Sequence, residues 1–307
     1  MSYWPTITAR QARALEGKPW TIDGRVLYFG SFHIGGEAFA SAMVDGAGRV
    51  VAFLRFLNKR FTTPGRIHRT EWLIAQRLDS KSDLFTAAPR AWASTGKRSS
   101  PRPPGIDFDF TATVHNAAPG KSWKEMKAAI DGGLDSLPCE NIRITAAKQL
   151  ITSLATLEVA EFVHGDLSDG NVVIDPSSGS LRLIDFDALV FKKSTTLAHP
   201  QLPTSLGGVK GTTGYMPADL EQSDSPNCTP YSDRHARDML LLEILGFVQD
   251  DPPDLSPKFW GDPHLTLEAV SPLARKMGMP HLCQPTVFSA PENTRPSSRQ
   301  LASILNL

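Results

Sequence analysis

The stretch "GRVLYFGSFHIGGEAFASAMVDGAGRVVAFLRFL", residues 24–57, places the strongest constraint on the fold of this chain. Apolar and polar residues alternate along it, and "GG" and "DGAG" interrupt the alternation. Alternation with a period of two is typical of strands with one buried face, and short glycine-rich breaks are typical of hairpin turns. The stretch therefore predicts an antiparallel meander of three strands.

Helical spacing of apolar residues dominates the rest of the chain. It occurs in residues 66–78, whose middle carries Glu71, and again in residues 141–160. Two later helices are predicted at "SDRHARDMLLLEILGF" and at "RPSSRQLASIL", where Pro296 suits a first turn. A chain that is first rich in strands and then rich in helices is typical of a segregated α+β protein.

The length of 307 residues allows two lobes, each with its own core. We expect an N-terminal leader over residues 1–19, which has a helical pattern. A strand-rich lobe would follow over residues 20–115, and a mainly helical lobe over residues 116–307.

Charge and cysteine content disfavour several classes of function. Lysine plus arginine equal aspartate plus glutamate, with 32 of each, so no net field favours nucleic acid or an anionic membrane as the main partner. The three cysteines are far apart and indicate neither a disulfide framework nor a zinc site. The N-terminal sequence lacks the apolar core of a signal peptide, and no apolar run is long enough for a membrane span. We expect a cytoplasmic protein, or an effector that is delivered into another cell.

A second informative stretch, "FVHGDLSDGNVVIDPSSGSLRLIDFDAL", covers residues 162–189. Two short β-type runs, "VVI" and "LRLI", flank "DPSSGS", which has the composition of a turn. Asn171 and Asp185 are equidistant in sequence from Ser178, at the centre of this turn. A symmetric hairpin would therefore place their side chains next to each other at its open end.

The oxygen ligands at that end suit a magnesium site. The amide of Asn171 and the carboxylate of Asp185 are hard donors of limited charge, which Mg²⁺ accepts when phosphate and water supply further ligands. Asp166 lies five residues before Asn171 in a loop, where it can orient an attacking hydroxyl or accept its proton. Taken singly, these residues have a simpler interpretation, in which Asp166 and Asn171 cap turns and Asp185 ends a strand.

Together, these residues resemble the catalytic and metal-binding loops of the protein kinase-like superfamily. "HGDLSDGN" is similar to that family's His-x-Asp-Leu motif with an Asn five residues after the Asp, and "IDFDAL" is similar to its Asp-Phe-Gly motif. The resemblance implies a bilobal α+β fold with an antiparallel sheet in the N-lobe and a mainly helical C-lobe. It also implies that Asp166 orients or deprotonates the acceptor hydroxyl, while Asn171 and Asp185 hold Mg²⁺ on the phosphates of ATP.

Later motifs extend the resemblance. "GTTGYMPAD", residues 211–219, is similar to the segment that shapes the family's protein-substrate platform. Thr212 resembles the threonine that hydrogen-bonds the catalytic Asp in serine/threonine kinases, and Asp233 resembles the aspartate that anchors the catalytic loop. Arg295 resembles the arginine that pairs with the acid closing the platform segment, here Asp219, so the resemblance predicts a buried ion pair between them.

The N-terminal lobe resembles the nucleotide-binding half of a kinase. "HIGGEAF" is similar to the glycine-rich loop, in which backbone N–H groups of Gly35 and Gly36 would approach phosphates. Glu71 occupies the position of the helical acid that clamps the family's nucleotide-binding lysine. No lysine follows "VVA", so Arg55 is the cation at about the right place, and Leu54 occupies the alternative register, which points to the other face of the sheet.

Further positions complete the site that the resemblance implies. Backbone groups near Thr113 to Asn116, among them those of Thr113 and His115, would contact adenine. Ser168 stands where kinases carry the lysine that neutralises the transferring phosphate, and Gly165 stands where many carry the arginine that receives a phosphorylated loop. Hydroxyl residues after Leu189 offer autophosphorylation sites, namely Ser194, Thr195, Thr196, Thr204 and Ser205.

We therefore predict an atypical, bacterial-type serine/threonine protein kinase that transfers phosphate from MgATP to a protein hydroxyl. A pseudokinase that binds nucleotide or acts as a scaffold is one alternative, which Arg55 and Ser168 favour. A small-molecule phosphotransferase of the aminoglycoside or choline type is the other, since "HGDL" without a following lysine also resembles those enzymes. The predicted partner is a protein substrate, with neither nucleic acid nor a membrane, and the sequence indicates no oligomeric state.

Overall fold

The chain divides into two compact units, Met1–Ala118 and Pro119–Leu307. The computed structural model describes residues 6–34, 38–57, 64–85, 87–96, 100–191, 211–216, 232–246, 272–284, 286–289 and 294–307. Within these ranges, no helix is both long and apolar enough to cross a membrane.

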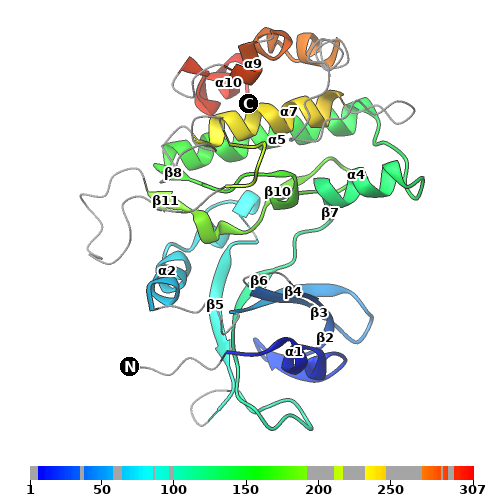
Figure 1. Ribbon diagram of the computed structural model, residues 1–307, viewed down its shortest axis with the longest axis vertical. Coiled ribbons are helices and arrows are strands. Elements are labelled where there is room, and N and C mark those ends of the chain that lie inside the picture. Colours follow the sequence, from blue (N-terminus) through cyan, green and yellow to red (C-terminus); the bar gives the residue numbers. More distant parts are fainter. Residues whose placement is uncertain are drawn as a thin grey trace. The chain divides into compact units, whose positions relative to one another are not determined.

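The first unit contains a six-stranded antiparallel sheet with the order β1-β2-β3-β4-β6-β5 (Figure 1). The predicted meander is confirmed, because β2, β3 and β4 are neighbours in this order. The six strands are β1 (Pro19–Ile22), β2 (Arg25–Ile34), β3 (Ala38–Val44), β4 (Val50–Leu57), β5 (Pro89–Ser94) and β6 (Thr111–Asn116).

One face of this sheet carries an aromatic core. Its rings lie with centroids 5.0 to 6.3 Å apart, at distances typical of stabilising aromatic pairs. Helix α1 (Ala9–Leu15) adds Ala12 and Leu15 to the same cluster, so the predicted leader is packed and partly helical. The buried aromatic members of the cluster are Trp20, Phe29, Phe39, Phe56 and Phe110.

Helix α2 (Pro64–Ala75) corresponds to the helix predicted over residues 66–78 and packs against β5. It ends earlier than predicted because Arg77 adopts a left-handed backbone conformation, with φ of 51°. A short helix α3 (Leu78–Lys81) and a 3-10 turn η1 (Asp83–Phe85) lead into β5.

The second unit is mainly helical. Helix α5 (Glu140–Val159) runs alongside α7 (Ser232–Gly246), and α10 (Ser298–Ile304) packs on α5 (Figure 1). These correspond to the three helices predicted for this part, although Pro296 precedes the α10 N-cap rather than lying in its first turn. Further described helices of this unit include α4 (Trp123–Asp131), α9 (Thr286–Ser289) and the 3-10 helices η2 (Asp169–Asn171), η3 (Phe186–Ala188) and η4 (Pro280–Cys283).

Two small sheets support the loops of the candidate site. One has the order β10-β9-β7, formed by β10 (Leu181–Leu183), β9 (Val172–Ile174) and β7 (Lys121–Ser122). The other pairs β11 (Val190–Phe191) with β8 (Phe162–Val163). The hairpin β9–β10 therefore follows β8 directly, with the predicted catalytic loop between them.

The register of this hairpin differs by one residue from the prediction. Leu183 pairs with Val172, and the Ile184 N–H donates to the Asn171 carbonyl at 3.0 Å, so Ile184 rather than Asp185 lies opposite Asn171. The turn is the cause. The Asp175 N–H donates to the Ser180 carbonyl and closes a loop with an even number of residues, which includes Gly179 at φ of +73°.

Candidate active site

The loop between β8 and β9 is anchored by an acid from α7. One carboxylate oxygen of Asp233 accepts the His164 N–H at 2.6 Å and the other accepts the Gly165 N–H at 3.0 Å. Asp233 lies in the first turn of α7, so the helix holds the loop through two of the loop's backbone N–H groups. The predicted anchoring contact of Asp233 is confirmed.

Gly165 has a steric role that its sequence position did not reveal. Its φ is +80°, and a Cβ atom there would lie 2.5 Å from the Ala188 carbonyl oxygen. Only glycine allows this close approach without displacement of backbone. The adjacent His164 places Nε2 3.0 Å from the Ile184 carbonyl, and since a carbonyl only accepts, Nε2 carries the proton. The loop thus packs directly against the segment that contains Asp185.

Both carboxylate oxygens of Asp166 receive hydrogen bonds. The Thr212 hydroxyl donates to Oδ1 at 3.0 Å, and the Asn171 amide donates to Oδ2 at 3.2 Å and to the Asp166 carbonyl at 2.7 Å. The contact predicted between Thr212 and Asp166 is confirmed. These donors fix the orientation of the carboxylate, as a group that must meet an acceptor hydroxyl requires.

The environment of Asp166 favours proton acceptance. Burial raises the pKa of Asp166, and the nearby charge of Asp185 adds to this effect, while the Thr212 hydrogen bonds and the charge of His164 oppose it. A carboxylate with a raised pKa is a stronger base than an ordinary aspartate at the surface. The arrangement therefore suits a general base or an orienting group.

Asp185 lies just beyond the end of β10, in a left-handed conformation with φ of 57° and ψ of 65°. Aspartate tolerates this region better than most residues. Asp185 directly follows Ile184, which lies opposite Asn171, so it remains at the open end of the hairpin despite the one-residue difference in register. Its charge also contributes to the raised pKa of Asp166. The structure thus brings together Asp166, Asn171, Asp185 and Thr212.

The donor set fits a magnesium ion. The amide nitrogen of Asn171 is held by Asp166, which leaves the amide oxygen as the ligand atom and adds it to the carboxylate of Asp185. Hard oxygen donors of this kind suit Mg²⁺, which takes its remaining ligands from water or phosphate. In the ranges that the structure describes, no group of three or more His, Cys, Asp or Glu side chains is placed to hold a metal.

Ser168 contributes a backbone carbonyl to the loop, and its side chain is buried. It is 3 % exposed, and its carbonyl accepts the Asn171 N–H at 3.0 Å. This bond begins the 3-10 turn η2 that presents Asn171. A role of the Ser168 side chain toward a phosphate stays a prediction.

In the first unit, the side-chain directions along β4 distinguish the two predicted registers, in which either Arg55 or Leu54 occupies the position of the kinase lysine. Leu54 is fully buried in the aromatic core, so Arg55 lies on the opposite face of the sheet, paired with Thr113 of β6. The neighbouring pair, Phe53 with His115, lies on the same face. Arg55, Thr113 and His115 therefore share one face, as the Arg55 register requires.

Hydrogen bonds order this face. The Thr113 hydroxyl lies 2.7 Å from His115 Nε2 and 3.3 Å from the Arg55 carbonyl. His115 Nδ1 lies 2.9 Å from the Ala87 carbonyl, so Nδ1 carries a proton. These bonds tie β6 to β4 and to the segment before β5, where Ala87 lies two residues ahead of the strand.

Three other residues of the first unit are predicted to bind nucleotide. Glu71 lies on α2 with its carboxylate about half exposed and 3.3 Å from His68 Nδ1. Gly35 and Gly36 lie outside the described residues. The nucleotide-binding roles of all three residues stay predictions.

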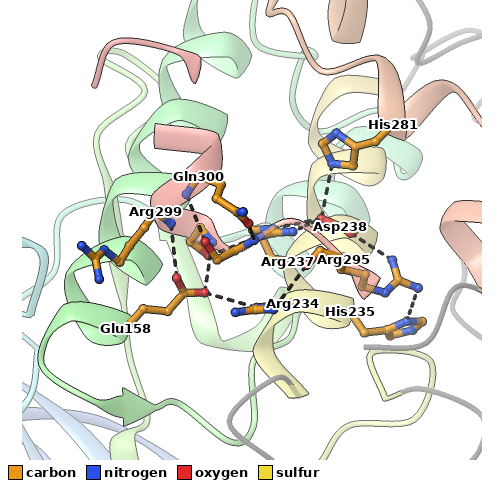
Figure 2. A network of polar contacts seen from close by, with 11 residues as sticks. Glu158, Arg234, His235, Arg237, Asp238, His281, Arg295, Arg299 and Gln300 are labelled. Atoms are coloured by element: carbon orange, nitrogen blue, oxygen red, sulfur yellow. Dashed lines mark hydrogen bonds and ion pairs between the residues drawn. The ribbon is translucent and has the colours of Figure 1, made fainter. Parts of the chain in front are cut away.

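Arg295 lies in a buried polar network between α7 and the C-terminal part of the chain (Figure 2). It donates to Asp238 at 2.9 Å and lies 3.0 Å from His235 Nδ1. Asp238 also accepts from Arg237 at 2.7 and 2.9 Å. Asp219, the partner predicted for Arg295, lies outside the described residues.

Two acids of this network, Asp238 and Glu158, help to hold the C-terminal segment that contains α10. Burial would raise the pKa of Asp238, but the charges of Arg237, His281 and Arg295 hold it well below its ordinary range. Glu158 at the end of α5 accepts the Ser298 N–H at 3.0 Å, at the start of α10. The network therefore joins α5, α7 and α10 (Figure 2).

A second buried acid, Glu243 of α7, has no counterpart among the predicted site residues. It is 0 % exposed and accepts hydrogen bonds from Tyr215 at 2.6 Å, Lys127 at 2.8 Å and Trp123 at 2.9 Å. Lys127 also lies 3.0 Å from Asp169 in the loop that carries Asp166. The one available signal was a single acid within the apolar run "MLLLEIL".

Comparisons with known proteins identify the fold. No protein-family model matches the chain, and no curated protein matches its sequence. Among solved structures, the crystal structure of the Toxoplasma gondii specific rhoptry antigen kinase domain matches with a TM-score of 0.62, covering 96% of this chain and 87% of that chain. The chain has a protein kinase-like fold. At 14% identity, the similarity concerns the fold alone.

The kinase-like fold confirms the predicted fold class. An antiparallel sheet occupies the first unit and helices dominate the second, as expected for a bilobal α+β protein. Within this kinase-like fold, the second unit carries Asp166, Asn171, Asp185 and Thr212, and the first unit carries the face with Arg55.

Proposed function

We propose that this chain is a serine/threonine protein kinase that transfers the γ-phosphate of MgATP to a protein hydroxyl. The observation that carries the proposal is the state of Asp166, whose carboxylate is held at both oxygens by Thr212 and Asn171 and has a raised pKa. Its loop is fixed to α7 by Asp233. In a kinase-like fold, this arrangement supports phosphoryl transfer.

Asp166 would orient the acceptor hydroxyl and take up its proton. An incoming Ser or Thr hydroxyl placed within hydrogen-bond reach of the carboxylate would be aimed at the phosphate, which removes most of the entropic cost of the encounter. The Thr212 bond to Oδ1 keeps the carboxylate from rotating away. Thr212 also supports the choice of a protein serine or threonine as the acceptor, since the resemblance assigns this threonine to such kinases.

Asn171 and Asp185 would hold the Mg²⁺ of MgATP, which supplies positive charge beside the phosphates. In the first unit, Arg55 would contact phosphate, and backbone near Thr113 and His115 would contact adenine. Arginine binds phosphate through a planar fork, so its geometry differs from that of a lysine. Glu71 would orient this cation, and Gly35 and Gly36 would approach the phosphates.

The finer assignment is an atypical, bacterial-type kinase. Gly165 supports it, because no side chain fits where many kinases carry an arginine that receives a phosphorylated loop. Regulation by loop phosphorylation is therefore not part of the proposal. The autophosphorylation sites predicted between Ser194 and Ser205 lie outside the described residues. A protein substrate is the proposed partner.

One observation favours a second candidate, a pseudokinase that binds nucleotide without transfer. Ser168 is buried and brings no positive charge to the position where the resemblance places a phosphate-neutralising lysine. If Arg55 does not replace that charge, MgATP would bind and remain intact. The two candidates therefore differ in turnover and not in nucleotide binding.

A transfer assay with γ-labelled ATP and Mg²⁺ tests the proposal. We expect label on Ser or Thr of the protein itself or of a generic protein substrate, and no label with Asp185→Asn. Asp131→Asn serves as the control, because Asp131 is an exposed acid at the end of α4. A thermal shift with MgATP and no transfer would instead indicate a pseudokinase, and label on an aminoglycoside or choline alone would indicate a small-molecule phosphotransferase.

A further inference from the structure

Glu243 accepts hydrogen bonds from three side chains, which come from two separate parts of the second unit. Tyr215 donates to Oε1, whereas Trp123 and Lys127, both from α4, share Oε2. Burial raises the pKa of Glu243 to about 7, although Lys127 and Tyr215 hold it down. Burying a carboxylate costs desolvation free energy, and an apolar residue in its place is often at least as stabilising. The buried acid therefore suggests a role other than stability.

Tyr215 links Glu243 to the residue that holds Asp166. The Tyr215 N–H donates to the Thr212 carbonyl at 3.0 Å, so one turn joins the two residues. The turn has a side-chain bond at each end, from Thr212 to Asp166 and from Tyr215 to Glu243. Tyr215 is 2 % exposed, so its end of the turn is fixed in the core. A continuous path of hydrogen bonds therefore connects Glu243, Tyr215 and Thr212 to Asp166.

Lys127 connects the same acid to the other side of the loop. Its ammonium lies 2.8 Å from Glu243 and 3.0 Å from Asp169, three residues after Asp166. Burial lowers the pKa of Lys127, but the charges of Glu243 and Asp169 outweigh it and the net shift is upward. The lysine therefore stays charged and bridges α7 to the loop.

We propose that Glu243 is a positioning residue that sets the geometry of Asp166 from two sides, through Tyr215 and Thr212 on one side and through Lys127 and Asp169 on the other. This inference rests on the proposed function for its kinetic consequence. The geometric part stands on the contacts alone. A buried ion pair adds little stability compared with an apolar replacement but can specify a unique arrangement, which is what a fixed catalytic carboxylate needs.

Two phenylalanine variants separate positioning from plain stability. Tyr215→Phe removes the bond between the turn and Glu243, whereas Trp123→Phe removes a bond to the same carboxylate and keeps the Tyr215 hydroxyl. We expect hydrogen–deuterium exchange in residues 164–171 to rise with Tyr215→Phe and to change little with Trp123→Phe. Equal exchange in both variants, or no change in Tyr215→Phe, would overturn the proposal.

A double-mutant cycle gives the kinetic test. We expect Tyr215→Phe to lower kcat about five- to tenfold, with the KM for ATP changed less than about twofold, because the orientation of Asp166 is affected and nucleotide binding is not. In a Thr212→Val background, Tyr215→Phe should have little further effect, while Trp123→Phe should remain additive.

The outcomes are distinguishable from those of the proposed function. Additive losses for Tyr215→Phe and Thr212→Val would overturn the role of Glu243 in positioning. If the wild-type protein shows no transfer but the two phenylalanine variants show the expected difference in exchange, the proposed function alone is refuted. The structural link between Glu243 and Asp166 would still be supported.

Discussion

At the scale of single residues, close approach and burial decide what each position tolerates. Gly165 adopts φ of +80° and leaves no room for a Cβ atom beside the Ala188 carbonyl, whereas Gly133 at φ of +67° has nothing within 4 Å of such an atom. We expect Gly133→Ala to cost about 1 kcal/mol of unfolding free energy and Gly165→Ala about 3 kcal/mol or more. Urea unfolding of both variants measures this, and equal losses would contradict the close packing of the loop.

Glu243 gives a prediction about pH. Its pKa is raised from 4.5 to about 7 in the folded protein, so the folded state binds more protons than the unfolded state between these values. The contribution of this group to stability is therefore greatest below pH 4.5 and falls as the pH rises to 7. We expect wild type to lose on the order of 2–3 kcal/mol relative to Glu243→Gln between pH 4.5 and pH 7.5. Unfolding curves at both pH values test it, and parallel changes would count against it.

At the scale of elements, β4 separates a structural residue from a proposed ligand-binding residue. Leu54→Ala should cost about 2–5 kcal/mol, because Leu54 fills the aromatic core. Arg55→Ala should cost less than about 1 kcal/mol and weaken ATP binding, since Arg55 lies on the opposite face. Thermal unfolding and nucleotide titration of the two variants test this pair. If a folded Leu54→Ala variant lost ATP binding while Arg55→Ala kept it, the roles assigned to the two residues would be reversed.

Asp238 binds Arg237 of α7 and Arg295, which lies shortly before the C-terminal helix α10. Asp238→Asn leaves Arg237 and Arg295 without their shared carboxylate, and we expect a loss of about 3–5 kcal/mol at pH 7. The lowered pKa of Asp238 means that its stabilising contribution is present above its ordinary value of 3.8 and is lost as the pH falls further below that value. The difference between wild type and variant should therefore shrink in strong acid. Asp131→Asn is the matched control and should show no such loss.

Sequence patterns predicted most elements, and the errors have local causes. The period of two along residues 24–57 identified the meander because one face of those strands is buried. The hairpin after Asn171 was predicted, but its register depended on an even-numbered turn closed by Asp175 and Ser180, which composition does not specify. The choice between Leu54 and Arg55 required knowing which face meets the aromatic core.

Long-range contacts account for the rest. Asp166, Asn171 and Asp185 were predicted as a group because they lie within one short stretch, and Thr212 because of a resemblance. Glu243 was not predicted, because its donors lie 28 to 120 residues away along the chain. A pairing of this kind follows from tertiary packing and leaves only a lone acid in an apolar helix as its trace.

At the scale of the whole molecule, the chain has a kinase-like fold and an Asp166 carboxylate that Thr212 and Asn171 hold by hydrogen bonds. The fold itself fixes no activity, so the proposed function depends on Asp166 and its partners in the second unit. The balanced charge of the chain provides no bulk attraction for an anionic ligand. The proposed binding of MgATP would therefore depend on local groups, such as Asn171, Asp185 and Arg55.

The most direct measurement is the single-turnover rate of phosphate transfer from MgATP to a protein hydroxyl. Wild type and the Asp131→Asn control should transfer at rates within about twofold of each other. Asp166→Asn should be slower by about 10²- to 10⁴-fold, because it keeps the shape of the side chain and removes the proton acceptor. Transfer by Asp166→Asn at the wild-type rate would contradict the central role assigned to Asp166.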